Sequence, residues 1–151
     1  LAVGRTVQPY YIAAINEYVE RTKHYIPFDV EIIPELKNTK SLTEEQQKER
    51  EADLILKALQ PGDTVVLLDE HGKEYRSLEF AQVMQKKMSA SRDVVFAIGG
   101  PYGFSQAVYE RANGKISLSQ MTFSHQMVRL FLIEQIYRAM TILRGEPYHH
   151  E

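Results

Sequence analysis

Residues 94–103 read VVFAIGGPYG, five apolar residues followed at once by a glycine-rich turn. A continuous apolar run of this length is typical of a strand that is covered on both faces, as in a parallel sheet. Residues 65–68, VVLL, repeat the pattern, and Asp69 and a turn at His71 and Gly72 follow them. The sequence therefore predicts two buried strands, each ending in a polar or glycine-rich loop.

Helical patterns separate these strands from further ones. Thr43 with Gln46 is a capping-box pattern and predicts the start of one helix. Ser77 and Ser105 are residue types that cap helices, so we expect a helix after each of them. The remaining expected elements are strands at residues 1–3, 28–33 and 116–119, and helices from Pro9 onward and over residues 125–143.

Strands and helices alternate five times along the chain. This order predicts an α/β fold with a parallel sheet of five or six strands and helices on both faces. Because no linker or internal repeat is apparent, we expect residues 1–151 to form a single domain. Residues 1–3 are only a stub of a strand, which leads us to expect further residues before them.

Composition narrows the class of protein. The 151 residues include 18 Lys and Arg against 20 Asp and Glu, and 44% are hydrophobic, as in ordinary soluble domains. No apolar run approaches the roughly 18 residues of a membrane span, so we expect no membrane partner. The absence of cysteine suits the cytoplasm. Near-neutral charge gives no argument for nucleic acid, and we expect no DNA partner.

The helix expected over residues 125–143 is apolar around most of its circumference. Such a helix is typically buried nearly all round, whereas one sheet covers only one of its faces. We therefore expect a second copy of the chain to cover the other face, as in a homodimer. The polar residues of this helix form a narrow stripe: Gln126, Arg129, Glu134, Arg138 and Thr141.

The loops after Leu68, Ile98 and Leu118 are expected at one edge of a parallel sheet, which is where ligands usually bind. The glycine loop lets backbone N–H groups approach a nucleotide-like ligand, but it is equally typical of a tight turn. It matches neither the dinucleotide fingerprint nor a P-loop. The histidines show no metal-binding pattern, and no nucleophile elbow is present.

Two other function classes fit these patterns. A Rossmann-like nucleotide-binding enzyme with another small-molecule substrate would explain the alternating elements and the glycine loop. A non-catalytic dimeric interaction module would explain the apolar last helix. The polar and aromatic end of the chain, residues 148–151, reads YHHE and is in most proteins a frayed terminus.

Several longer stretches resemble one known family. They are LAVGR at 1–5, VVLLDEHGK at 65–73, VVFAIGGPYG at 94–103 and ISLSQMTFSHQMVRLFLIEQIYRAMTILRGEPYHHE at 116–151. Together they resemble the bacterial RlmH family of SPOUT-class methyltransferases over essentially the whole chain. The resemblance implies an S-adenosylmethionine-dependent enzyme that N3-methylates a pseudouridine of 23S ribosomal RNA, on the assembled ribosome in the cytoplasm. It also implies a homodimer with a C-terminal trefoil knot.

The resemblance implies site residues as well. For S-adenosylmethionine these are Leu68, Gly100, Ser119, Gln120, Met121, Thr122, Phe123 and Ser124. For the RNA and its target base they are Arg138, Tyr148 and His149, with Tyr148 expected to stack on the base and His149 to accept a proton. His150 stands where the family usually has Arg or Lys, and Ser124 where proline is frequent.

Overall fold

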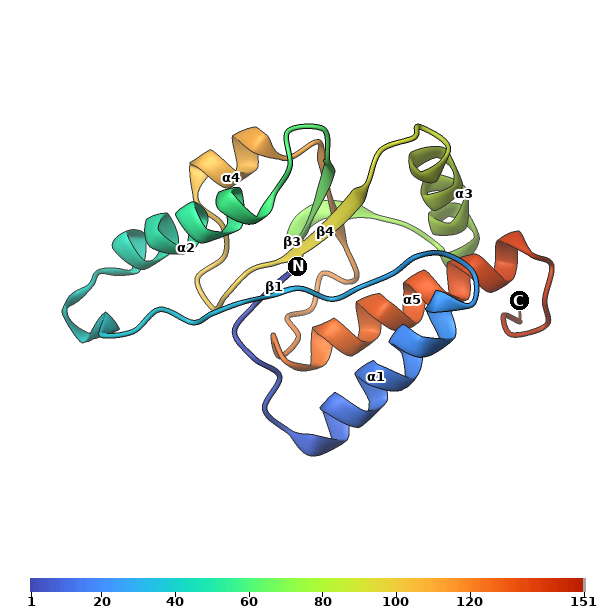
Figure 1. The fold of residues 1–151 in the computed structure, drawn as a ribbon, viewed down its shortest axis with the longest axis horizontal. Coiled ribbons are helices and arrows are strands. Elements are labelled where there is room, and N and C mark those ends of the chain that lie inside the picture. Colours follow the sequence, from blue (N-terminus) through green and yellow to red (C-terminus); the bar gives the residue numbers. More distant parts are fainter. Residues whose placement is uncertain (151) are drawn as a thin grey trace.

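The computed structural model describes residues 1–150 and contains one parallel sheet (Figure 1). Its five strands lie in the order β2-β1-β4-β3-β5, and every paired neighbour is parallel. The strands are β1 (Ala2–Val3), β2 (Ile32–Ile33), β3 (Thr64–Glu74), β4 (Val94–Ile98) and β5 (Gly114–Ser117). The helices are α1 (Pro9–Lys23), α2 (Glu44–Ala58), α3 (Ser77–Met88), α4 (Gln106–Arg111) and α5 (Met127–Leu143), with a 3-10 turn at Thr39–Ser41.

Helices cover both faces of the sheet, which confirms the expected α/β fold. Of the five or six strands expected, the sheet has five. Alternate residues of β3 point to opposite faces. Val65 and Leu67 pack in a core with α2 and α4, while Val66 packs in a second core with α3 and α5. In Figure 1, α2 and α4 lie together on one side of the strands, and α1 lies along α5 on the other.

Several elements differ from the sequence-based expectation at their ends. β2 is only Ile32–Ile33, because Phe28 and Val30 pack against α1 and α5 instead of extending the strand. Thr43 and Gln46 do form the expected capping box. Ser77, in contrast, is the first residue of α3, and its hydroxyl donates to Gln135 of α5 rather than capping its own helix.

The other boundary shifts are smaller. Ser105 occupies the N-cap position of α4, but its side chain makes no capping hydrogen bond. β5 begins and ends two residues earlier than expected, and α5 begins two residues later. Among the described residues, no helix is both long enough and apolar enough to cross a membrane.

β3 does not end at Leu68 as the sequence suggested. It bulges and continues to Glu74, so that Leu68 and Lys73 both pair with Ile116 of β5. The bulge is possible because Gly72 lies directly against the β5 backbone: a Cβ on Gly72 would sit 2.4 Å from the carbonyl carbon of Ile116. The turn expected at His71 and Gly72 therefore lies inside β3, between the two stretches of β3 that pair with β5.

We expect Gly72→Ala to destabilise the protein by about 1–3 kcal/mol, because the new methyl group must displace the β5 backbone. The midpoint of urea unfolding measures this change. Gly62→Ala is the matched control, since a Cβ on Gly62 meets nothing within 4 Å and should leave stability unchanged or slightly raised. Equal stability of the two variants would contradict the close packing of β3 on β5.

Arg129 departs from the expected polar stripe of the last helix. It is only 3% exposed, and its guanidinium donates to the carbonyl oxygens of Val3 and Gly4, each at 2.7 Å. It also donates to Thr6 Oγ1 at 3.1 Å and to the His125 carbonyl oxygen at 3.2 Å. Arg129 thus joins the segment after β1 to the start of α5, and its charge is satisfied inside the protein.

Candidate functional site

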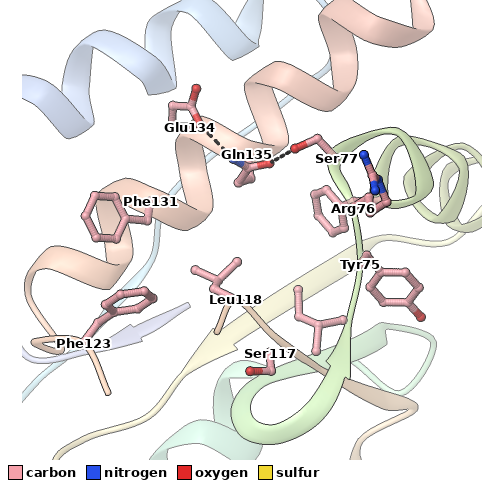
Figure 2. A pocket seen from close by; sticks show the side chains of 11 residues that line it. Tyr75, Arg76, Ser77, Ser117, Leu118, Phe123, Phe131, Glu134 and Gln135 are labelled. Carbon is pink, nitrogen blue, oxygen red and sulfur yellow. Dashed lines mark hydrogen bonds between the residues drawn. The ribbon is translucent and has the colours of Figure 1, made fainter. Parts of the chain in front are cut away.

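A cavity of about 400 Å³ lies between α3, α5 and the end of β5 (Figure 2). Its size falls in the range of small-molecule sites. It is lined by Tyr75, Arg76, Ser77, Phe80, Ile116, Ser117, Leu118, Phe123, Phe131, Glu134 and Gln135. Phe123 lies in the loop between β5 and α5, and the other residues belong to, or directly flank, the end of β3, the start of α3, β5 or α5.

The walls of this cavity combine aromatic rings with one carboxylate. The rings of Phe123 and Phe131 meet edge to face with centroids 5.4 Å apart. The Glu134 side chain is 19% exposed, and its Oε2 accepts from Gln135 at 3.2 Å. Ser77 in turn donates to Gln135 Oε1 at 3.0 Å, which links α3 to α5 as Figure 2 shows. The aromatic rings suit a ligand that carries a flat ring.

The expected cofactor loops begin at the same level of the sheet. Leu68 pairs with Ile98 of β4 and with Ile116 of β5, so the segments that follow these residues start side by side. The cavity opens next to the third of these loops. Of the expected cofactor residues, however, only Phe123 lines it, and Leu68 packs in the core beneath.

Internal hydrogen bonds shape the loop at residues 119–124. The Ser117 hydroxyl donates to the Ser119 carbonyl oxygen at 2.7 Å, and Ser119 Oγ accepts from the Met121 N–H at 3.0 Å. The Met121 side chain is 75% exposed. Gln120, Thr122 and Ser124 do not line the cavity.

Gly100 lies apart from the cavity, against a residue that sequence reasoning missed. A Cβ on Gly100 would be 2.8 Å from a carboxylate oxygen of Glu51 in α2. Burial raises the pKa of Glu51, the nearby Glu35 adds to this, and a hydrogen bond from the Gly100 backbone opposes it. A larger residue at position 100 would therefore displace Glu51 as well as any ligand at this loop.

Tyr148 and His149, which were expected in a frayed terminus, contact α5. Arg138 donates to Glu134 Oε1 at 2.5 Å, and its guanidinium lies 4.7 Å from the centre of the Tyr148 ring. Tyr148 donates its hydroxyl to the same Glu134 oxygen at 2.9 Å, and it lies 3.2 Å from the Tyr18 hydroxyl of α1. Arg138 Nη1 is also 3.2 Å from His149 Nδ1. We call these five residues the tail cluster.

The tail cluster brings together the three expected RNA-site residues, Arg138, Tyr148 and His149. Burial, followed by the hydrogen bonds to Tyr18 and Glu134, raises the pKa of Tyr148, so its phenol stays protonated at neutral pH. His150 is exposed, and Glu151 lies outside the described residues.

Glu134 connects the two parts of the site, because it lines the cavity and also holds Arg138 and Tyr148. The sequence marked Glu134 only as a polar residue of the last helix. Phe131 lies three residues before Glu134 and Arg138 four residues after it, so all three share one helix face. This spacing was the signal that could have placed Glu134 in the site.

A second, larger groove, of about 980 Å³, lies near Leu1. Its walls are largely apolar and include Ile26, Phe28, Met88 and Phe96. None of the expected site residues lines it. The smaller cavity is therefore the better candidate for the site.

Comparisons with known proteins identify the family of the chain. Residues 1–149 match the protein family described as "Predicted SPOUT methyltransferase". Over 152 aligned residues the chain is 70% identical to the ribosomal RNA large subunit methyltransferase H of Bacteroides fragilis, covering all of this chain and 97% of that protein. The proteins of the same name from Bacteroides thetaiotaomicron and Flavobacterium johnsoniae are 69% and 55% identical, with the same coverage.

Proposed function

The chain belongs to the SPOUT methyltransferase family, and from this premise we propose that it methylates N3 of a pseudouridine in 23S ribosomal RNA, with S-adenosylmethionine as donor. The observation that carries the proposal is its 70% identity, over the full chain, to a protein named as a large-subunit ribosomal RNA methyltransferase. Membership of the family also implies the C-terminal trefoil knot. As partners we propose a second copy of the chain and 23S rRNA within the ribosome, in the cytoplasm.

The cavity beside Phe123 fits S-adenosylmethionine. Its aromatic and aliphatic walls, Phe123, Phe131 and Leu118, suit the flat adenine ring. When bound, the donor supplies an electrophilic methyl group. The protein then has to hold the donor and the target nitrogen in line, so positioning accounts for most of the rate gain.

The tail cluster supports binding of the base. Tyr148 offers an aromatic ring, and Arg138, one turn from the cavity-lining Glu134, and its neighbour His149 offer hydrogen-bonding groups. Base stacking on aromatic rings is a general means of holding a nucleotide that has left its helix. In this proposal the cavity binds S-adenosylmethionine and the tail cluster binds the target base of the RNA.

We expect Leu118→Trp to abolish detectable binding of S-adenosylmethionine, because the indole would fill much of a cavity of about 400 Å³. Isothermal titration calorimetry measures the affinity, and Leu118→Met is the control, since it conserves volume. Unchanged affinity in the tryptophan variant, with a folded protein by circular dichroism, would place the donor elsewhere.

The proposed activity is tested by transfer of a labelled methyl group from S-adenosylmethionine. Ribosomes and deproteinised 23S rRNA, both from a strain that lacks this activity, serve as parallel substrates. The proposal requires labelling of the ribosomes. No transfer to either substrate would refute it, whereas binding of NAD or ATP in place of S-adenosylmethionine would favour the Rossmann-like alternative.

Exposed apolar residues near the cavity support the proposed homodimer. Met121 is 75% exposed, and Phe131, which lines the cavity, is 38% exposed. Tyr10 and Ile12 of α1 are also exposed. A partner subunit that buries Met121 and Phe131 would bring its own residues to the mouth of the cavity.

A further inference from the structure

The hydrogen bond between Arg138 and His149 determines where the imidazole carries its proton. A guanidinium has only N–H donors, so His149 Nδ1, 3.2 Å from Arg138 Nη1, must be the acceptor. A nitrogen that accepts a hydrogen bond in its ring plane carries no proton. The neutral ring therefore has its proton on Nε2.

The orientation of Arg138 is itself fixed. Its other terminal nitrogen donates to Glu134 at 2.5 Å, and its guanidinium lies over the Tyr148 ring. Tyr148 donates to the same Glu134 oxygen. With carboxylate and ring both holding the guanidinium, Arg138 cannot turn away from Nδ1 without breaking these contacts.

The other ring nitrogen has no partner among residues 1–150. His149 Nε2 is buried and makes no hydrogen bond to any of residues 1–150. Buried polar atoms are rarely left unpaired, and an unpaired one at a candidate site indicates a bond made to something else. Since Nε2 carries the proton, the missing partner must be an acceptor.

We propose that His149 acts in the reaction as a hydrogen-bond donor, through Nε2–H, to a carbonyl oxygen beside N3 of the target base, and not as the base that removes the N3 proton. This inference rests on the proposed function. A proton cannot be taken up at Nε2, which already holds one. Uptake at Nδ1 would place an imidazolium against the Arg138 guanidinium, and like charges at this distance repel.

A donor at this place suits the chemistry of an imide. When the N3–H bond breaks, the proton passes to water, and the electron pair left on N3 forms the new bond to the methyl carbon. The bond from that carbon to the sulfur of the methyl donor breaks at the same time, and its electron pair stays on the sulfur. The negative charge that develops spreads onto the two carbonyl oxygens beside N3. A preoriented N–H group at one of these oxygens stabilises that charge and promotes loss of the proton.

The tautomer is tested by NMR of the protein with ¹⁵N-labelled histidine, where protonated and unprotonated ring nitrogens differ widely in chemical shift. The His149 signals are those that vanish in His149→Gln. We expect an unprotonated Nδ1 and a protonated Nε2, and in Arg138→Met a mixture of both tautomers. A wild-type ring protonated on Nδ1 would overturn the inference.

The role is tested by comparing His149→Gln with His149→Ala. The glutamine amide supplies an N–H near the position of Nε2 and has no basicity. We expect His149→Ala to lower kcat about a hundredfold, the typical effect of removing one such hydrogen-bond donor. We expect His149→Gln to restore most of this loss. The affinity for S-adenosylmethionine should be unchanged in both variants. If His149→Gln is as inactive as His149→Ala while the wild type methylates ribosomes, His149 does not act as a hydrogen-bond donor in the reaction. If the wild type itself transfers no methyl group, the proposed function fails, and this role with it.

Discussion

Replacing both Tyr148 and His149 by alanine is expected to lower methyl transfer by at least about a hundredfold, while S-adenosylmethionine affinity stays within about twofold of the wild type. Neither residue lines the cavity. Both lie in the tail cluster, whose contacts with the cavity run through Glu134. A lower kcat or a higher KM for ribosomes, without a change in S-adenosylmethionine affinity, would thus show that the tail acts on the RNA and the cavity on the methyl donor.

Single-turnover kinetics and calorimetry on the same samples measure the two effects. His24→Ala is the control for removal of a histidine, because His24 is exposed at the end of α1 and outside both parts of the site. A parallel fall in donor affinity and in methyl transfer would contradict this division, because it would show that the tail supports the cavity.

If the tail of one subunit serves the cavity of its partner, mixed dimers are expected to regain activity that neither parent has. One subunit carries Leu118→Trp, which blocks the cavity, and the other lacks residues 148–151. Phe131, Glu134 and Arg138 share one face of α5, with the cavity toward one end and the tail cluster toward the other. If this face forms an interface whose twofold axis is perpendicular to α5, the two helices run antiparallel, and the tail of one subunit lies nearer the cavity of the other.

In such a heterodimer the intact cavity of one subunit meets the intact tail of its partner. Random mixing should therefore restore about a quarter of the wild-type activity, since half of the dimers are mixed and each has one complete site. Sedimentation must show dimers for each parent. Mixtures as inactive as both parents would mean that the tail serves its own subunit, and a monomer would refute the proposed interface.

Periodicity and turn residues predicted most of the fold. The apolar runs at 65–68 and 94–98 form adjacent parallel strands, and Thr43 caps α2 as its spacing to Gln46 indicates. Local patterns failed where tertiary packing decides the outcome. β3 continues to Glu74 only because Gly72 fits against Ile116, a contact between residues 44 positions apart.

The site was predictable in part. A resemblance of motifs pointed to Arg138, Tyr148 and His149, and the structure places them in contact. Glu134 and Tyr18 were missed, because their role depends on how the chain end folds back on α5 and α1. The tautomer of His149 likewise follows from the position of Arg138 Nη1, which no sequence pattern reveals.

Nucleoside analysis of ribosomal RNA tests the central claim most directly. Ribosomes from a strain that lacks this enzyme are incubated with the pure protein and S-adenosylmethionine, and the 23S rRNA is digested and examined by mass spectrometry. We expect one new nucleoside, a pseudouridine carrying a methyl group on N3, and none with the Leu118→Trp variant. A methyl group on another nucleoside, or none at all, would contradict the proposed function.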